Sequence, residues 1–245
     1  MATGTQDQQG GPRLVELQVA ADPVGWRAAG FHVDADTVHL GGVALRLLGS
    51  SDDATGIVGW TLAGVAEITT LDGLPTTTVA ADGATEPPGA TPPPVSHPNS
   101  ATKLDHVVVL TPDLERTIEA CEAAGLDLRR IRETESYGAP MRQAFFRLGT
   151  TILEVVSGDA GTGVPAEDAP ATWFGLAVDV DDLEEVATQL GEGLGSIKVA
   201  VQDGRRIATF RHKALGMGVA VAAMDDHAAR AAQPEPADLG DRQGR

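Results

Sequence analysis

The chain has 245 residues, a hydrophobic content of 42% and a formal net charge of −17 at pH 7, enough apolar material for one large domain or two small ones. The acidic balance argues against a nucleic-acid partner, because a phosphate backbone would be repelled. Cys121, the single cysteine, cannot form an internal disulfide, and no stretch approaches the roughly 20 apolar residues of a membrane span. We therefore expect a soluble protein with no membrane partner, located in the reducing cytoplasm.

A short strand-helix-strand pattern occurs three times along the chain, and its first copy is the most reduced. LVELQVA at Leu14–Ala20 opens this copy, and LGGVALRLL at Leu40–Leu48 closes it. The strand-like run Gly56–Val65 then resembles the start of a further, truncated unit. Residues 13–80 are therefore predicted to form a degenerate N-terminal module that supplies a packing surface or a dimer contact.

Two segments are predicted to lie outside any core. Residues 81–103 are dense in Pro, Gly, Ala and Thr and have no apolar period, which is typical of a linker. Residues 226–245 are polar and interrupted by Pro and Gly, which predicts a disordered tail.

The middle copy contains a full set of elements. The β-branched run from His106 to Val109 predicts a buried strand, and the helix after it can be capped by Thr111 or Asp113 and stops at Gly125. Three further strands are predicted, at Leu128–Glu133, Arg142–Arg147 and Leu148–Val156. The unit is therefore βαβββ.

The third copy repeats this order. Trp173–Val180 predicts its first strand, Asp182 stands at the helix start, and Arg206–Arg211 and Gly218–Met224 supply later strands. Residues 104–225 thus hold two βαβββ units in tandem. Because one four-stranded sheet with a single helix cannot cover its own apolar face, we expect the two units to pair.

With these elements in place, residues 104–225 resemble the vicinal oxygen chelate superfamily, the group of glyoxalases, bleomycin-resistance proteins and extradiol dioxygenases. The resemblance rests on the paired βαβββ order, the LDHVVV opening strand, the DLE helix start and the ILEVV closing strand. It implies an α+β fold in which paired modules form a cup-shaped curved sheet. It also implies a divalent metal ion at the floor of the cup, held by the first and last strands of each unit.

The resemblance assigns site residues by position. His106 matches the first-strand metal ligand and Glu154 the last-strand ligand of the first unit, and Glu154 is also the candidate catalytic base. In the second unit the first-strand position is Gly175, and the closing strand Gly218–Met224 contains no His, Glu, Asp or Gln. The implied cofactor, Zn, Ni, Fe or Mn, therefore has an incomplete ligand set, which waters, a partner chain or Glu16 could complete.

Arg142 and Phe146 are the candidates for substrate binding. They lie on one face of their predicted strand, since side chains alternate along a strand. Arg206 and Phe210 repeat the pair in the second unit, so a symmetric structural role is an equal alternative.

Several hypotheses for the function stay open. One is a metal-dependent lyase, isomerase or dioxygenase that acts on a small oxygen-rich molecule, whose oxygens the metal would polarise. Another is a metal-free binding or resistance-type protein that holds a small molecule in the same cup. A third is an interaction protein whose cup has collapsed. A homodimer is compatible with all of them.

Overall fold

The structure is a computed structural model, and it describes residues 10–51, 54–81, 95–136, 139–158 and 168–227. Most of the linker predicted at 81–103, and the tail predicted at 226–245 from residue 228 onward, lie outside these residues. The expected domain boundaries stay a prediction.

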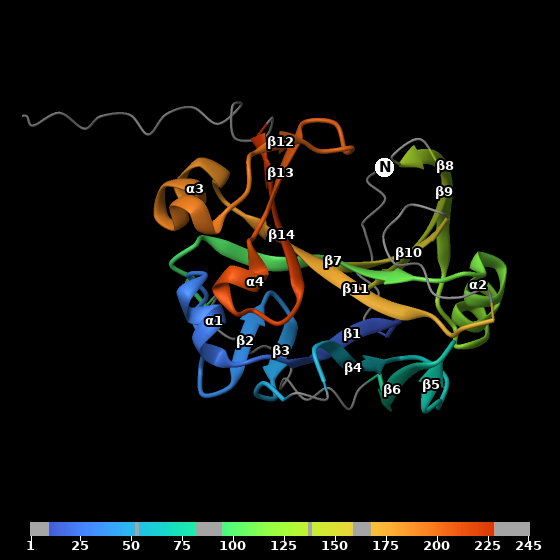
Figure 1. Cartoon of the computed structure of the whole chain (residues 1–245). Coiled ribbons are helices and arrows are strands. Elements are labelled where there is room, and N and C mark those ends of the chain that lie inside the picture. Colours follow the sequence, from blue (N-terminus) through green and yellow to red (C-terminus); the bar gives the residue numbers. More distant parts are fainter. Residues whose placement is uncertain (1–9, 52–53, 82–94, 137–138, 159–167, 228–245) are drawn as a thin grey trace, which may run out of the picture.

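The described residues form a six-stranded and an eight-stranded mixed sheet (Figure 1). The smaller sheet has the order β2-β3-β1-β4-β6-β5. Its elements are β1 (Arg13–Ala20), α1 (Pro23–Ala28), β2 (Thr37–Leu40), β3 (Val43–Leu47), β4 (Gly56–Ala63), β5 (Thr70–Leu71) and β6 (Leu74–Val79).

The larger sheet has the order β12-β13-β14-β11-β7-β10-β9-β8. Its first module contains β7 (Ala101–Leu110), α2 (Leu114–Ala123), β8 (Leu128–Ser136), β9 (Ala139–Leu148) and β10 (Thr151–Gly158). Its second module contains β11 (Thr172–Val180), α3 (Leu183–Leu190), the 3₁₀ turn η1 (Gly191–Gly193), β12 (Lys198–Val199), β13 (Arg205–Thr209), α4 (His212–Leu215) and β14 (Ala220–Asp226).

Both sheets are built around one antiparallel pair with a parallel strand on each side. In the larger sheet β7 pairs antiparallel with β11. β10 runs parallel to β7, and β14 runs parallel to β11. In the smaller sheet β1 and β4 form the antiparallel pair, flanked by β3 and β6. The larger sheet curls so that β8–β9 and β12–β13 rise at its two ends (Figure 1). The expected α+β fold with paired modules in a curved sheet is confirmed.

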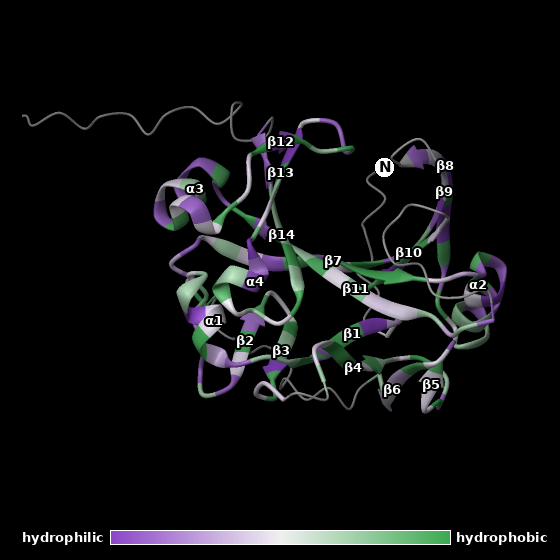
Figure 2. Ribbon diagram, viewed as in Figure 1, coloured by the Kyte–Doolittle hydropathy of each residue, from purple (hydrophilic) through white to green (hydrophobic). Residues whose placement is uncertain are grey.

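The helices begin where the sequence places caps. The Asp113 carboxylate accepts a hydrogen bond from the backbone N–H of Arg116 at 3.0 Å, and Asp182 caps α3 in the same way through Glu184. α2 then buries Leu114, Thr117, Ile118 and Cys121 against the sheet. Hydrophobic residues follow the central strands, while β8 and much of the outer side of α2 are hydrophilic (Figure 2).

Side chains of both sheets share one hydrophobic core. Trp60 of β4 packs edge-on against Trp173 of β11, with ring centroids 4.9 Å apart. No helix among the described residues has the length and apolar content that crossing a bilayer requires.

Candidate functional site

A cavity of about 360 Å³ lies on the larger sheet. Strands β7 and β10 contribute Asp105, His106, Ile152 and Glu154 to its lining. Strands β8 and β9 contribute Arg129, Arg130 and Phe145, and the segment before β13 contributes Gln202. The guanidinium of Arg130 stacks over the Phe145 ring, 4.7 Å from its centroid. The cavity thus combines charged groups of both signs with an aromatic surface.

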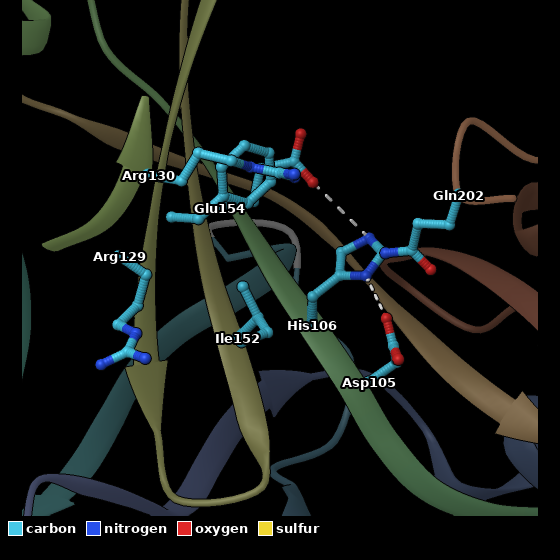
Figure 3. A pocket seen from close by; sticks show the side chains of 8 residues that line it. Asp105, His106, Arg129, Arg130, Ile152, Glu154 and Gln202 are labelled. Carbon is cyan, nitrogen blue, oxygen red and sulfur yellow. Dashed lines mark hydrogen bonds and ion pairs between the residues drawn. The ribbon is translucent and has the colours of Figure 1, made fainter. Parts of the chain in front are cut away.

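The imidazole of His106 lies between two carboxylates (Figure 3). Its Nδ1 is 2.7 Å from Oδ2 of Asp105, and its Nε2 is 3.8 Å from Oε2 of Glu154. An ionised carboxylate only accepts hydrogen bonds, so the short contact assigns the proton of neutral His106 to Nδ1. The Nε2 lone pair then faces Glu154 and is available as a base or a ligand.

Asp105 is held in its ionised form. Burial alone would raise its pKa, but hydrogen bonds and charge interactions with His106 and Arg205 outweigh burial and bring the pKa of Asp105 well below its usual range. Arg205 Nη1 donates to Oδ1 of Asp105 at 2.9 Å. Each carboxylate oxygen of Asp105 therefore has its own partner.

Glu154 is positioned by a neighbour on β9. The side-chain amide of Gln143 donates to Oε1 of Glu154, which leaves Oε2 facing His106. The Glu154 side chain is 16% exposed and His106 is 17% exposed, so both groups are screened from bulk water. The structure brings His106 and Glu154 together in one cavity.

A β-bulge places Asp105 beside His106. Neighbours in a regular strand face opposite sides of the sheet, but the register of β7 against β11 shifts here. His106 lies opposite Ala177 and Leu104 opposite Val178, so Asp105 has no partner residue. A bulge of this kind turns a side chain toward the face of its neighbour. The signal in the sequence is an acidic residue directly before a histidine in an otherwise apolar strand, and sequence reasoning missed it.

The same bulge recurs in the first strand of every module. At each of these bulges one residue has no partner on the paired antiparallel strand, and these residues are Val15, Val58, Asp105 and Phe174. The residues that follow these bulges are Glu16 in β1, Gly59 in β4, His106 in β7 and Gly175 in β11. The first module of each pair thus carries a polar side chain at this position, and the second carries glycine.

The last strands complete this comparison. On the first strand of its module, the residue two places after His106 pairs with Glu154 on the parallel last strand. In the other three modules, the residue two places after the equivalent position pairs with Arg46, Thr77 and Ala222. In the smaller sheet Arg46 forms an ion pair with Glu16, Nη2 to Oε2, at 2.9 Å. Glu16 is therefore engaged in its own sheet and does not line the cavity.

The donor set does not fit a resident divalent metal. Catalytic zinc sites use three protein ligands, whereas this cavity offers His106 Nε2 and Glu154, and no group of three or more His, Cys, Asp or Glu residues in the described part of the chain is arranged to hold a metal ion. A Cβ atom at Gly175 would lie 2.5 Å from the backbone oxygen of Ala220. The second module therefore has no room for a ligand at the equivalent position.

Arg142 and Phe146 lie on the opposite face of β9. Arg142 Nη1 contacts Oε1 of Glu115 on α2 at 2.7 Å, and Phe146 is 0% exposed in the core. Their expected common face is present, but it is turned toward α2. Phe145, the intervening neighbour, lines the cavity instead.

No family model matches the chain, and no curated protein matches it. Among solved structures, a mutant of 4-hydroxymandelate synthase from Streptomyces coelicolor is similar, with a TM-score of 0.59, 16% sequence identity, and 87% of this chain and 92% of that chain covered. A fusion protein of a xylose isomerase-like TIM barrel and 4-hydroxyphenylpyruvate dioxygenase has a TM-score of 0.55 and 11% identity, with 87% of this chain and 49% of that chain covered.

Methylmalonyl-CoA epimerase from Mycobacterium tuberculosis shows a lower likeness, with a TM-score of 0.43, 19% identity, and 55% of this chain and 95% of that chain covered. At these identities it is the fold that the structural likeness establishes. The sheet order and the two structural matches that each cover 87% of this chain agree, and the chain therefore has the fold of the vicinal oxygen chelate superfamily, as the resemblance in the sequence predicted.

Proposed function

We propose that the cavity of the larger sheet binds a small oxygen-rich molecule and exchanges a proton with it through His106, in an isomerase or lyase type of reaction that needs no resident metal. The observation that carries this proposal is the Asp105–His106 pair, whose Nδ1 contact leaves Nε2 facing Glu154 and the cavity. A base held in this way is suited to removing a proton from a carbon next to a carbonyl group.

The remaining groups suit the same chemistry. Asp105 stabilises the imidazolium that forms when Nε2 accepts a proton, and Glu154 faces Nε2 at 3.8 Å, where it stabilises the same charge. Arg130, stacked on Phe145, supplies positive charge for a carboxylate or for an oxygen that becomes negative during proton removal. A 2-oxo acid has both features and is our proposed type of ligand.

A deuterium-exchange experiment tests the proposal. Pyruvate and 4-hydroxyphenylpyruvate, the second taken from the name of a structural relative, are incubated with the protein in D₂O, and loss of the proton signal next to the ketone is followed by NMR. We expect exchange above the buffer rate for at least one probe and a return to the buffer rate in His106→Gln. His39→Gln is the control, because His39 is exposed on the smaller sheet. Equal rates in the wild type and His106→Gln would contradict the proposal.

The metal-dependent form of the reaction has a separate test. Protein purified without chelator is analysed for Zn, Ni, Fe and Mn. Because Asp105 is engaged by His106 and Arg205, His106 and Glu154 remain as donors in the cavity, and we expect less than about 0.1 equivalent for a site short of the usual three ligands. About one equivalent in the wild type, lost in His106→Ala, would restore the metal-dependent lyase, isomerase or dioxygenase.

A binding protein of the resistance type is the second candidate. It is favoured by the second module, whose Gly175 and Ala222 add no reactive group at the positions equivalent to His106 and Glu154. Chemical-shift changes of the His106 ring on adding a probe, without exchange above the buffer rate, would assign this function.

We further infer a homodimer in the cytoplasm. The support is the single buried cysteine, Cys121, which suits a reducing compartment, and the smaller sheet as a candidate contact surface. Light scattering on the full chain tests the dimer.

A further inference from the structure

We propose that Arg205 is a positioning residue that fixes the orientation and the tautomer of His106 by holding Asp105. The inference rests on the proposed function of His106 as a proton acceptor. It gives the second module a part in the site, although this module offers only Gly175 and Ala222 at the positions of His106 and Glu154.

Arg205 is clamped from several sides. Its Nη1 donates to Asp105 Oδ1 at 2.9 Å and to Gln202 Oε1 at 2.7 Å, and its Nη2 donates to Asp179. The side chain is 16% exposed. Asp179 is in turn 3.1 Å from Nζ of Lys103. The guanidinium therefore has a fixed place between β7, β11 and β13.

The clamp acts at the bulge of β7. Asp105 has no partner residue on β11, so the register of the strands does not fix its side chain. Arg205 occupies one carboxylate oxygen and leaves the other for His106 Nδ1 at 2.7 Å. Because a planar guanidinium holds a carboxylate in a defined geometry, the Asp105 carboxylate is prevented from rotating away from His106. Without Arg205, we expect His106 to sample the tautomer with the proton on Nε2, which is inactive as a base.

The neighbouring arginine offers a matched control. Arg206 lies on the same strand and pairs with Asp225, which is 1% exposed, and with Glu184 of α3 at 2.9 Å. It does not line the cavity. Removing Arg206 breaks a buried ion pair of the same kind without touching Asp105 or His106.

The experiment compares Arg205→Gln, Arg205→Lys and Arg206→Gln in the full chain labelled with ¹⁵N-histidine. Long-range ¹H–¹⁵N NMR spectra report which ring nitrogen of His106 carries the proton, and they require no ligand. We expect the Nδ1–H form in the wild type and in Arg206→Gln, and a mixture of tautomers in Arg205→Gln. Deuterium exchange of the active probe should fall about 10- to 100-fold in Arg205→Gln, the range known for outer groups that orient a metal-ligating histidine, and remain near the wild-type rate in Arg206→Gln.

Arg205→Lys keeps the positive charge and serves if Arg205→Gln does not fold. A single ammonium group cannot hold Asp105 and Asp179 in the planar geometry of Arg205, so we expect a smaller change in the same direction in the spectrum and in the exchange rate. A wild-type His106 spectrum in the folded Arg205 variants would overturn the inference. Absence of exchange in the wild type would contradict the proposed function alone, since the tautomer measurement does not depend on a ligand.

Discussion

At the scale of single residues, Gly175 shows that packing decides which chemistry a position can carry. A Cβ atom there would lie 2.5 Å from the oxygen and 3.0 Å from the Cβ of Ala220 on the paired strand β14. Backbone atoms on both sides cannot move apart without disturbing the pairing of β11 and β14. The close approach of β11 and β14 therefore excludes any side chain, and with it a metal or proton donor, at position 175 of the second module.

This contact predicts the effect of a small substitution. Gly175→Ala should lower the free energy of unfolding by about 1–3 kcal/mol, the usual cost of overpacking, as measured by urea unfolding. Gly42→Ala is the matched control, because a Cβ atom at Gly42 meets nothing within 4 Å and should change stability by less than about 1 kcal/mol. Equal effects of the two substitutions would contradict the packing argument.

Cys121 gives a second residue-scale prediction. Its side chain is 0% exposed, and burial, with smaller contributions from the Asp72 and Glu122 charges, raises its pKa to about 12. Since the thiolate is the reactive form, Cys121 should not react with a disulfide reagent at pH 8 while the protein is folded. Modification should follow the unfolded fraction as urea is added. Complete reaction within seconds in native buffer would show that the thiol is accessible.

At the scale of elements, α2 connects the larger sheet to the β5–β6 turn of the smaller one. Arg116 Nε donates to Asp72 Oδ1 at 2.8 Å, and Thr117 donates to the other carboxylate oxygen. The Asp72 side chain is only 8% exposed, so these partners take the place of water as its hydrogen-bond donors. The contact joins residues that are 44 positions apart in the chain.

Breaking this contact should therefore weaken the fold. Arg116→Met leaves a buried carboxylate without its charged partner, and we expect a loss of about 1–3 kcal/mol in the free energy of unfolding. Arg27→Met serves as control, because Arg27 is exposed and its hydrogen bond is to the backbone oxygen of Ala35. Urea unfolding of both variants measures the difference, and a loss in Arg27→Met as large as in Arg116→Met would refute the assignment.

The elements were largely predictable from the sequence, and the orientation of individual side chains was not. Repeated apolar runs and caps located the strands and helices of residues 104–225, and the resemblance paired His106 with Glu154. Asp105 was missed because strict alternation places it on the face opposite His106, and only the register between β7 and β11 reveals the bulge. Phe145 and Phe146 show a related limit, since two adjacent aromatic residues do not indicate which face of β9 forms the cavity.

At the scale of the whole molecule, buried ion pairs and the large negative net charge have opposite effects on how stability changes with pH. Asp105 and Asp225 lie in different parts of the larger sheet, and each is paired with an arginine of β13. For Asp225, burial would raise the pKa, but hydrogen bonds from Arg206 and from the backbone of Leu183 bring it below its usual value. Both carboxylates are thus deprotonated in the folded protein at pH values where the unfolded chain already binds protons.

The sign of the resulting pH dependence follows from linkage. An aspartate in an unfolded chain has a pKa of about 3.9, so the stabilisation from a lowered folded-state pKa is present above that pH and is lost as the pH falls below it. Repulsion between the negative charges has the opposite effect, and its loss on acidification should raise the stability. The reason is that the net charge of −17 at pH 7 shrinks toward zero near the pI of about 4.6. We expect the ion pairs to prevail below pH 4.

Urea unfolding of the wild type and Arg206→Gln between pH 7 and pH 3 separates these effects. Arg206→Gln should be less stable at pH 7, because Asp225, at 1% exposure, loses its charged partner. The two unfolding free energies should converge as the pH falls below the unfolded-chain pKa of about 3.9 and through the lowered pKa of Asp225, because protonation of Asp225 then removes the benefit of the arginine in the wild type. A difference that stays constant across the whole range would mean that Arg206 stabilises the sheet through packing of its side chain rather than through the charge of Asp225.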